Sequence, residues 1–216
     1  MKKAIIAVAI LCIPLFSCFA GGFYSNIVLL VDDPKKIIGT VLLLIMKELK
    51  AYYVSDFEKK SMVLYEEKLD DQNIKEGFKL AYSLSKSSKS ITVYTTSHDG
   101  DVLVMIILKN GESLFAYNSN PGYFNGEDIP PMIKDIDKLL LEYKDVNRED
   151  LLAVLESTDL SSEDIHKQIV ELLHLPGYSV DLGYQTLIHM DEQDKIELGN
   201  EYGIKITKLP YSPKNR

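Results

Sequence analysis

The chain has 216 residues and a formal net charge of −8, from 24 Lys and Arg against 32 Asp and Glu. Such an acidic chain is repelled by a phosphate backbone, so we expect no nucleic-acid partner. Its 46% hydrophobic and 26% charged residues are typical of one ordinary globular domain that is long enough to bury a core.

The first residues have the order of a secretory signal segment. Met1-Lys2-Lys3 is basic, and an uncharged apolar run of 13 residues follows from Ala4 to Phe16. This run is too short to span a bilayer comfortably as a helix. The sequence therefore predicts export, with a signal peptide over residues 1–17.

Both cysteines lie in this part of the chain, and Cys18 closes the tetrapeptide Leu15-Phe16-Ser17-Cys18. This tetrapeptide resembles the lipobox of bacterial lipoproteins, in which a Leu three residues before the Cys and a small residue just before it guide processing. The resemblance implies that Cys18 is lipidated and anchors the protein to a membrane of the bacterial cell envelope. The alternatives are cleavage after Ala20, which gives a secreted or periplasmic protein, and an uncleaved anchor.

Farther along the chain, residues 90–118 predict an antiparallel meander of three strands. The middle strand, Val102 to Leu108, is a run of apolar residues typical of a strand covered on both faces. Asp99-Gly100 and Asn110-Gly111 tolerate positive φ, and they predict type I′ hairpin turns on either side of it. We expect Val104 and Ile106 to share a buried face.

The N-terminal half predicts two more strands and two helices. The apolar segment from Phe23 to Val31 predicts a buried strand. Asp33-Pro34 indicates a helix start, and the helix is predicted to continue to about Tyr52. A short strand from Ser61 to Tyr65 and a helix capped by Asp71 follow.

The C-terminal half predicts three helices and a final strand. Apolar residues recur at helical spacing in three segments, which begin near Ile133, at Asn147 and at the capping sequence Ser161 to Asp164. Tyr184 to Met190 alternates in polarity and predicts a strand.

Together these elements predict an α+β fold with a single mixed β-sheet that contains the meander. Two helices belong to its N-terminal half and a three-helix segment to its C-terminal half. The expected organisation is a signal peptide over 1–17, a short membrane-proximal segment over 18–22, one α+β domain over 23–208 and a polar tail over 209–216.

Polar residues at the first hairpin turn are the candidates for chemistry. An imidazole between carboxylates, as His98 with Asp99 and Asp101, is able to bind a metal or act as a base. Asp-Gly is also what the turn itself requires, and a structural role is the favoured interpretation. His166 is a second weak candidate. Without a mature Cys pair or an HExxH motif, we expect neither a metal nor a cofactor.

The loop that follows the meander, residues 118–131, holds three Pro, two Gly and three Asn but also aromatic anchors. Tyr123 and Phe124, with Tyr117 just before the loop, are candidates for a partner-binding patch, because aromatic side chains contribute much interface energy at small entropic cost. The alternative is that these rings pack the loop onto the sheet.

Two segments resemble a family of uncharacterised bacterial proteins. They are the turn Ser97-His98-Asp99-Gly100-Asp101 and the loop from Tyr117 to Phe124, with its Pro-Gly-Tyr-Phe sequence. Parts of the later helical region, Glu163 to His166, Leu172 to Pro176 and Gly183-Tyr184, are similar to the same family. The resemblance covers roughly residues 23–192, and it implies fold boundaries but no chemistry.

Three hypotheses of function follow. The leading one is a lipid-anchored envelope protein that is non-enzymatic and binds a protein partner. A narrower version is an immunity-type protein whose acidic surface masks a basic toxin. The third is a hydrolase. Since no nucleophile elbow or phosphate-binding loop is present, its catalytic residues would have to form an unrecognised constellation, such as His98 or His166 with loop carboxylates.

Overall fold

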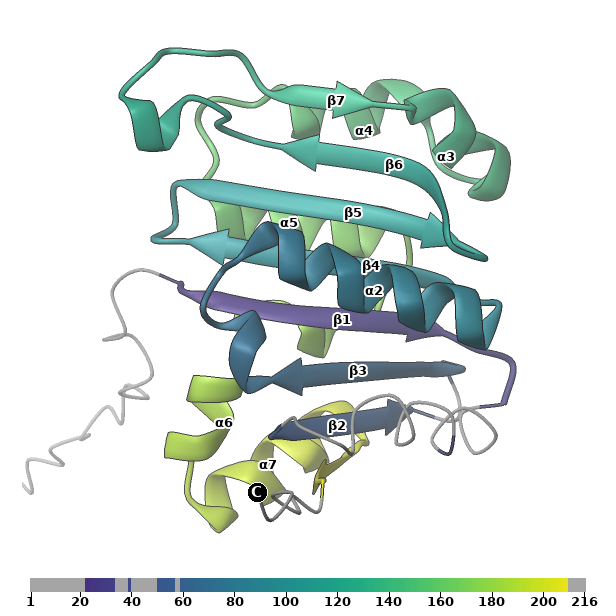
Figure 1. Cartoon of the computed structure of the whole chain (residues 1–216), viewed down its shortest axis with the longest axis vertical. Helices are drawn as coiled ribbons and strands as arrows, with labels where there is room; N and C mark the ends of the chain where they lie inside the picture. The colour runs from purple at the N-terminus through teal and green to yellow at the C-terminus, as the bar shows by residue number, and fades with distance from the viewer. Residues whose placement is uncertain (1–21, 34–38, 40–49, 57–58, 210–216) are drawn as a thin grey trace, which may run out of the picture.

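A computed structural model describes residues 22–33, 39, 50–56 and 59–209 of the chain. Its described part forms one eight-stranded sheet in the order β7-β6-β5-β4-β1-β3-β2-β8 (Figure 1). The strands are β1 (Tyr24–Leu30), β2 (Ala51–Asp56), β3 (Ser61–Glu66), β4 (Ile91–His98), β5 (Val102–Lys109), β6 (Glu112–Asn118), β7 (Met132–Lys134) and β8 (Lys205–Lys208). The predicted α+β class, single sheet and meander are confirmed, whereas the expectation of a mixed sheet was wrong, because each paired strand is antiparallel to its neighbours.

The meander forms because its two turns accept left-handed backbone. Asp99 and Gly100 have φ of 54° and 73°, and Asn110 and Gly111 have φ of 55° and 82°. At the second turn, where Lys109 pairs with Glu112, positive φ at both central residues gives the twist that a two-residue hairpin needs. The first turn leaves three residues between the paired His98 and Val102. The turns therefore align β4, β5 and β6, and Leu103, Met105 and Ile107 of the middle strand point into the main core.

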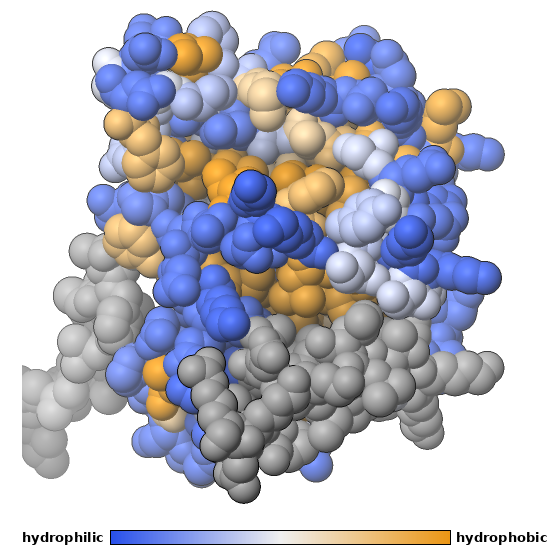
Figure 2. All heavy atoms as spheres, in the orientation of Figure 1, coloured by the Kyte–Doolittle hydropathy of each residue, from blue (hydrophilic) through white to orange (hydrophobic). Residues whose placement is uncertain are grey.

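Helices cover the two faces of the sheet unequally. In the described part, α2 (Ile74–Ser88) lies on the face toward the viewer in Figure 1, whereas α3 (Ile136–Glu142), α4 (Arg148–Leu155) and α5 (Ser162–Leu172) lie behind β5, β6 and β7. Two further helices, α6 (Tyr184–His189) and α7 (Glu192–Tyr202), flank the β1, β2 and β8 end, and three short 3₁₀ turns are η1 (Glu67–Leu69), η2 (Tyr123–Asn125) and η3 (Gly177–Ser179). Figure 2 shows apolar side chains gathered over the strands beside α2.

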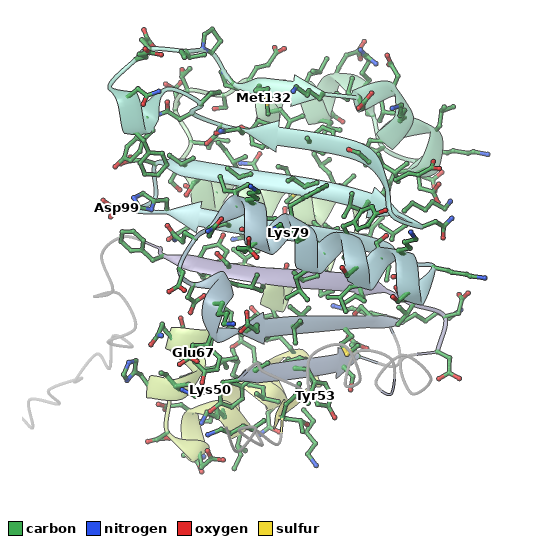
Figure 3. All side chains as sticks on the ribbon, viewed as in Figure 1. Lys50, Tyr53, Glu67, Lys79, Asp99 and Met132 are labelled. Atoms are coloured by element: carbon green, nitrogen blue, oxygen red, sulfur yellow. The ribbon has the colours of Figure 1, made fainter. Side chains whose placement is uncertain are left out.

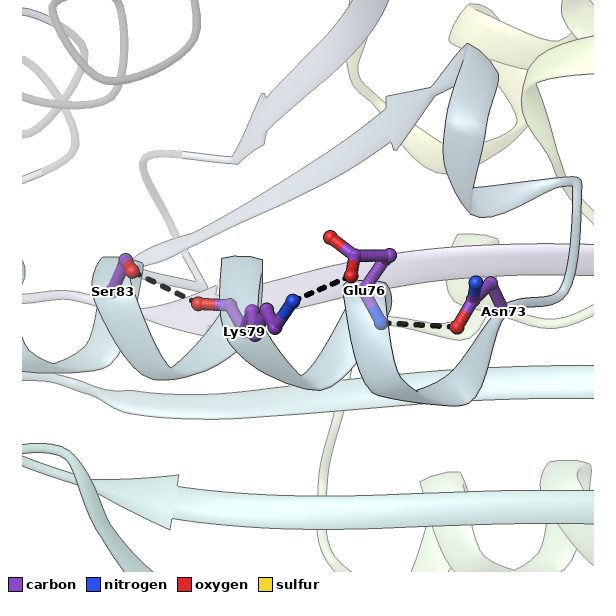
Figure 4. Close-up of polar contacts among 4 residues, drawn as sticks. All are labelled: Asn73, Glu76, Lys79 and Ser83. Atoms are coloured by element: carbon purple, nitrogen blue, oxygen red, sulfur yellow. Dashed lines mark hydrogen bonds and ion pairs between the residues drawn. The ribbon is translucent and has the colours of Figure 1, made fainter.

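Helix α2 connects β3 to β4, the two strands that flank β1. Asn73 caps it by accepting a hydrogen bond from the backbone N–H of Glu76, so the predicted Asp71 cap was wrong by two residues. Farther along, Lys79 pairs with Glu76 at 2.6 Å and the Ser83 hydroxyl donates to the Lys79 carbonyl (Figure 4). These contacts line the exposed side of a helix whose opposite side packs on the sheet.

Gly77 sets how closely α2 approaches the sheet. A Cβ at this position would lie 2.3 Å from Cζ of Tyr94, far inside van der Waals contact. Glycine therefore lets the helix pass directly over the Tyr94 ring. The smaller of the two apolar cores lies beneath it and contains Ile27, Leu29, Met62, Leu64, Ala81, Leu84, Tyr94 and Leu108.

The three predicted helices of the C-terminal half are present, but the first begins at Ile136 and not near Ile133, because Met132–Lys134 pair with β6 as strand β7. Asn147 caps α4 by accepting from the N–H groups of Glu149 and Asp150, and Ser161 caps α5 by accepting from Asp164. Their apolar sides pack with the meander in the larger core. The Tyr117 hydroxyl ties β6 to this layer by donating to the Leu155 carbonyl at 3.0 Å.

Two predictions of secondary structure need correction. Residues 184–190 do not form a strand, because residues 184–189 are helix α6, whose first turn is capped at long range: Asp70 Oδ2 accepts from the N–H of Gln185 at 2.6 Å. Burial of Tyr184 and Leu187 then follows helical spacing. The predicted helix to Tyr52 must end earlier, because β2 starts at Ala51; residues 34–38 and 40–49 lie outside the described residues.

The two faces of β5 yield a paired test. Ile107 is fully buried in the main core. Val104 and Ile106 lie on the other face, as expected, but only Val104 is buried, because Ile106 is partly exposed beside α2. We expect Ile107→Asp to lower the free energy of unfolding by on the order of 4–5 kcal/mol, and Ile106→Asp to lower it by about 1–2 kcal/mol. Urea unfolding followed by circular dichroism measures both, and equal losses would contradict the assignment of faces.

Candidate functional site

Three segments that are distant in sequence meet at one end of the sheet. Figure 1 shows the start of β1, the β4–β5 turn and the η2 loop at this end. The ring of His98 lies 4.7 Å from that of Phe23, 5.7 Å from Tyr123 and 5.0 Å from Phe124, measured between centroids, and each pair is edge-to-face. We call these four residues the aromatic end.

Hydrogen bonds hold the imidazole in place. Nδ1 of His98 bonds to Oε1 of Gln72, and Nε2 of Gln72 donates to the Ser97 carbonyl at 2.7 Å. Because an amide oxygen only accepts, Nδ1 donates this hydrogen bond. His98 therefore acts as the centre of the ring cluster.

The predicted carboxylates lie beside these rings. Asp99 lies at the outer tip of the hairpin (Figure 3). A hydrogen bond from the Tyr123 hydroxyl to Asp101, with the charge of Asp99 nearby, raises the pKa of Tyr123. The turn thus joins the aromatic end to an acidic surface, and the sequence-predicted residues His98, Asp101, Tyr123 and Phe124 come together.

The aromatic candidates differ in exposure. Phe124 is 69% exposed and Phe23 is 51% exposed, while Tyr117 is fully buried with its hydroxyl bonded inside the protein. Tyr117 is therefore a core residue and its assignment to a binding patch was wrong. Phe23 was missed, because a single aromatic at a strand start has no sequence signal that pairs it with His98.

The loop that presents Tyr123 and Phe124 is tightly braced. Asn118 Oδ1 accepts from the N–H of Asn120 at 3.0 Å, and the Gly122 carbonyl accepts from the N–H groups of Asn125 and Glu127. A Cβ at Gly122 would lie 2.0 Å from the Glu127 carbonyl oxygen, so only glycine allows this return of the chain. The rings consequently stand on a backbone that is already ordered.

A groove of about 630 Å³ adjoins the aromatic end on the other side of Asp101. Its walls are the β6–β7 loop and the connection from α4 to α5, and its lining residues are Asp101, Ser119, Asn120, Asp128, Ile129, Pro130, Pro131, Ile133, Glu156, Ser157, Thr158, Leu160 and Ile165. We call it the acidic groove, because each of its ionisable lining residues is a carboxylate. Asp128 and Glu156 were not predicted as site residues, because no pattern in the sequence brings them near Asp101.

His166 occupies a different place, in a buried polar network between β1 and α5. Its Nδ1 lies 2.6 Å from the Tyr24 hydroxyl, and burial lowers its pKa to about 3. The Ser97 hydroxyl bonds that of Ser162 at 2.8 Å in the same layer. At 1% exposure, His166 is a packed, neutral histidine that a substrate does not reach.

Two carboxyl groups, those of Glu163 and Asp181, are hydrogen-bonded to each other at the edge of this network. Burial, a hydrogen bond with Asp181 and the charge of Asp181 raise the pKa of Glu163 to about 7, while a hydrogen bond from the backbone of Gly22 opposes the rise. A Cβ at Gly22 would lie 2.0 Å from Oε1 of Glu163 and 3.2 Å from Oδ1 of Asp181. Both side chains therefore pack closely against Gly22, just before β1.

Among the described residues, no group of three or more His, Cys, Asp and Glu side chains is arranged to hold a metal ion. None of the helices in the same part of the chain is both long and apolar enough to cross a bilayer. Comparison with protein-family models, curated proteins and solved structures finds no match. The resemblance to the uncharacterised family stays a prediction, and Cys18 lies outside the described residues.

The Glu163–Asp181 pair predicts a specific pH dependence. Because the folded-state pKa of Glu163 is raised above its ordinary value, its contribution to stability is present at low pH and is lost as pH rises through about 7. Glu163→Gln cannot lose this proton. We therefore expect the free energy of unfolding of the variant minus that of the native protein to be larger at pH 8 than at pH 5.

Denaturant unfolding of both proteins at the two pH values measures this difference. His166 has the opposite pH dependence, but its contribution cancels because both proteins contain it. Glu171→Gln, at the exposed C-terminal part of the same helix, is the control and should show no such change. An equal effect of Glu163→Gln at pH 5 and pH 8 would show that the pKa of Glu163 is not raised in the folded protein.

Proposed function

We propose that this protein is an exported, lipid-anchored component of the bacterial cell envelope that binds a protein partner through its aromatic end and catalyses no reaction. The observation that carries the proposal is the exposure of Phe124 and Phe23 around a hydrogen-bonded His98. Exposed aromatic rings on an ordered backbone bind at little entropic cost.

The proposed anchor is close to these rings. Residues 18–22 span at most about 17 Å when extended, and Phe23 follows them directly. A lipidated Cys18 would hold the aromatic end near the bilayer surface, where it meets other envelope proteins. Asp99 and Asp101 favour a protein partner over the lipid itself, because carboxylates are repelled by anionic headgroups.

The buried state of His166 weighs against the hydrolase alternative, since one of the two histidines considered for it has no access to solvent. The immunity-type hypothesis is a narrower form of the leading one, in which the partner is a basic toxin. The acidic groove beside the aromatic end favours it.

Lipidation has a direct chemical test. The mature N-terminal peptide of the native protein should have the mass of a diacylated or triacylated peptide that begins at Cys18, and the protein should partition into detergent. Cys18→Ala should remove that mass and leave the precursor segment attached. An unmodified peptide that begins at Gly21 would establish ordinary secretion and remove the anchor from the proposal.

The binding role is tested in the intact envelope. A photoreactive phenylalanine analogue at position 124 of the full-length protein should form a discrete protein adduct. The same analogue at position 78, where the native Phe is 37% exposed on α2, is the matched control and should not form it.

With the captured protein in hand, Phe124→Ala should weaken binding about tenfold to thirtyfold, as truncation of an aromatic interface residue does, while the unfolding midpoint stays unchanged. Equal adducts from positions 124 and 78, adducts with lipid only, or unchanged affinity of Phe124→Ala would each refute the assignment of the aromatic end.

A further inference from the structure

The acidic groove has a shape and a lining that restrict what it can bind. Its volume of about 630 Å³ is sufficient for several side chains of a peptide. Ile133, Leu160 and Ile165 contribute apolar surface together with the Pro130-Pro131 pair. The groove therefore combines an apolar surface with negative charge.

The charge comes from three separate segments of the chain. Asp101 belongs to the β4–β5 turn, Asp128 to the β6–β7 loop and Glu156 to the C-terminal end of α4. The last carbonyl groups of a helix carry a partial negative charge, so the end of α4 adds to the same field. A ligand with positive charge is favoured throughout the groove.

The distribution of these carboxylates favours an extended cation over a metal ion. A metal needs several ligand atoms within about 2.5 Å of one point, and no such convergence of acidic, His or Cys side chains exists in the described residues. Lysine and arginine place a charge at the end of an apolar stem. The stem packs on apolar surface while the charged group meets a carboxylate.

The walls of the groove are held before any ligand binds. Ser162 donates its backbone N–H to the Gly100 carbonyl at 2.8 Å, which ties the start of α5 to the turn of Asp101. Ser119 and Leu103 exchange two hydrogen bonds at the base of the β6–β7 loop, at 2.8 and 2.9 Å. Little ordering is then required on binding.

We propose that the acidic groove binds an extended segment of the partner protein that carries lysine or arginine side chains between apolar residues. This inference rests on the proposed function and names the chemical class of the partner at that end of the molecule. Asp101 belongs to both surfaces, because it accepts from Tyr123 of the aromatic end and lines the groove, so one segment is able to contact both.

The test uses the full-length protein in detergent and three probes: a synthetic peptide of about six residues, roughly 20 Å long, that alternates Lys and Val; the matched Glu–Val peptide; and Ca²⁺ alone. Calorimetry should detect binding of the Lys–Val peptide only, and its affinity should fall as salt is raised. The triple variant Asp101→Asn, Asp128→Asn, Glu156→Gln should weaken binding at least tenfold.

The control is a second triple variant that removes the same charge at three exposed carboxylates outside the groove: Asp71→Asn, Asp145→Asn and Glu201→Gln. It should bind the Lys–Val peptide with the affinity of the native protein. Thermal melts establish that both variants are folded. If the triple variant of the groove fails to fold, Asp128→Asn alone should still fold, because Asp128 is a solvent-exposed loop residue, and it should still weaken binding of the peptide.

Four results would overturn the inference: equal weakening by both triple variants, equal binding of the Glu–Val peptide, binding of Ca²⁺ in place of the peptide, or no peptide binding at about 1 mM. The aromatic end is tested separately by Phe124→Ala and the captured protein. If that variant loses the partner while the groove variants keep it, the proposed function stands and the groove assignment fails.

Discussion

The antiparallel pairing of β1 with β4 is the constraint on which the rest of the molecule depends. Its register places Tyr24 opposite Ser97, so the next pair outward brings Phe23 beside His98 and starts the aromatic end. On its other side β1 pairs with β3, which makes it the strand that joins the meander to the β3–β2–β8 part of the sheet. Asn26, also on β1, donates to the carbonyl groups of Ser179 and Leu182 and so holds the segment before α6 against the sheet. One strand thereby positions both the candidate site and the C-terminal layer.

The polar network around β1 explains how a strand with polar residues can be central. Burying a hydroxyl, an imidazole or a carboxyl group costs free energy unless each finds a partner. The side chains of Tyr24 and His166 are hydrogen-bonded to each other, and Glu163, whose pKa is raised by burial, is hydrogen-bonded to Asp181. These groups therefore serve the fold, and in return they tie the start of β1, where the proposed anchor would pull, to helix α5.

In both proposed binding surfaces, the loops are held in place by contacts within the protein before any partner binds. Hairpin turns with positive φ, the glycine at position 122 and the cross-links from Ser119 and Ser162 fix the loops, while the exposed rings and carboxylates project from them. A ring cluster next to an acidic groove offers apolar contact and charge complementarity together. The first of these supplies affinity and the second supplies selection among partners.

Local rules in the sequence were sufficient for much of the fold and for part of the site. Apolar runs and Asp-Gly and Asn-Gly turns determined the meander, and Asn147 and Ser161 determined two helix starts, because each of these signals acts over a few residues. The same turn chemistry placed His98 and Asp101 together, and the Pro-Gly-Tyr-Phe loop identified Phe124. Only the tertiary structure decided that residues 184–189 are helical, that Tyr117 is buried and that Phe23, Asp128 and Glu156 join the site. Each of these depends on contacts between distant segments, such as the Asp70 cap on α6 or the register of β1 on β4, and no pattern within a few residues carries that information.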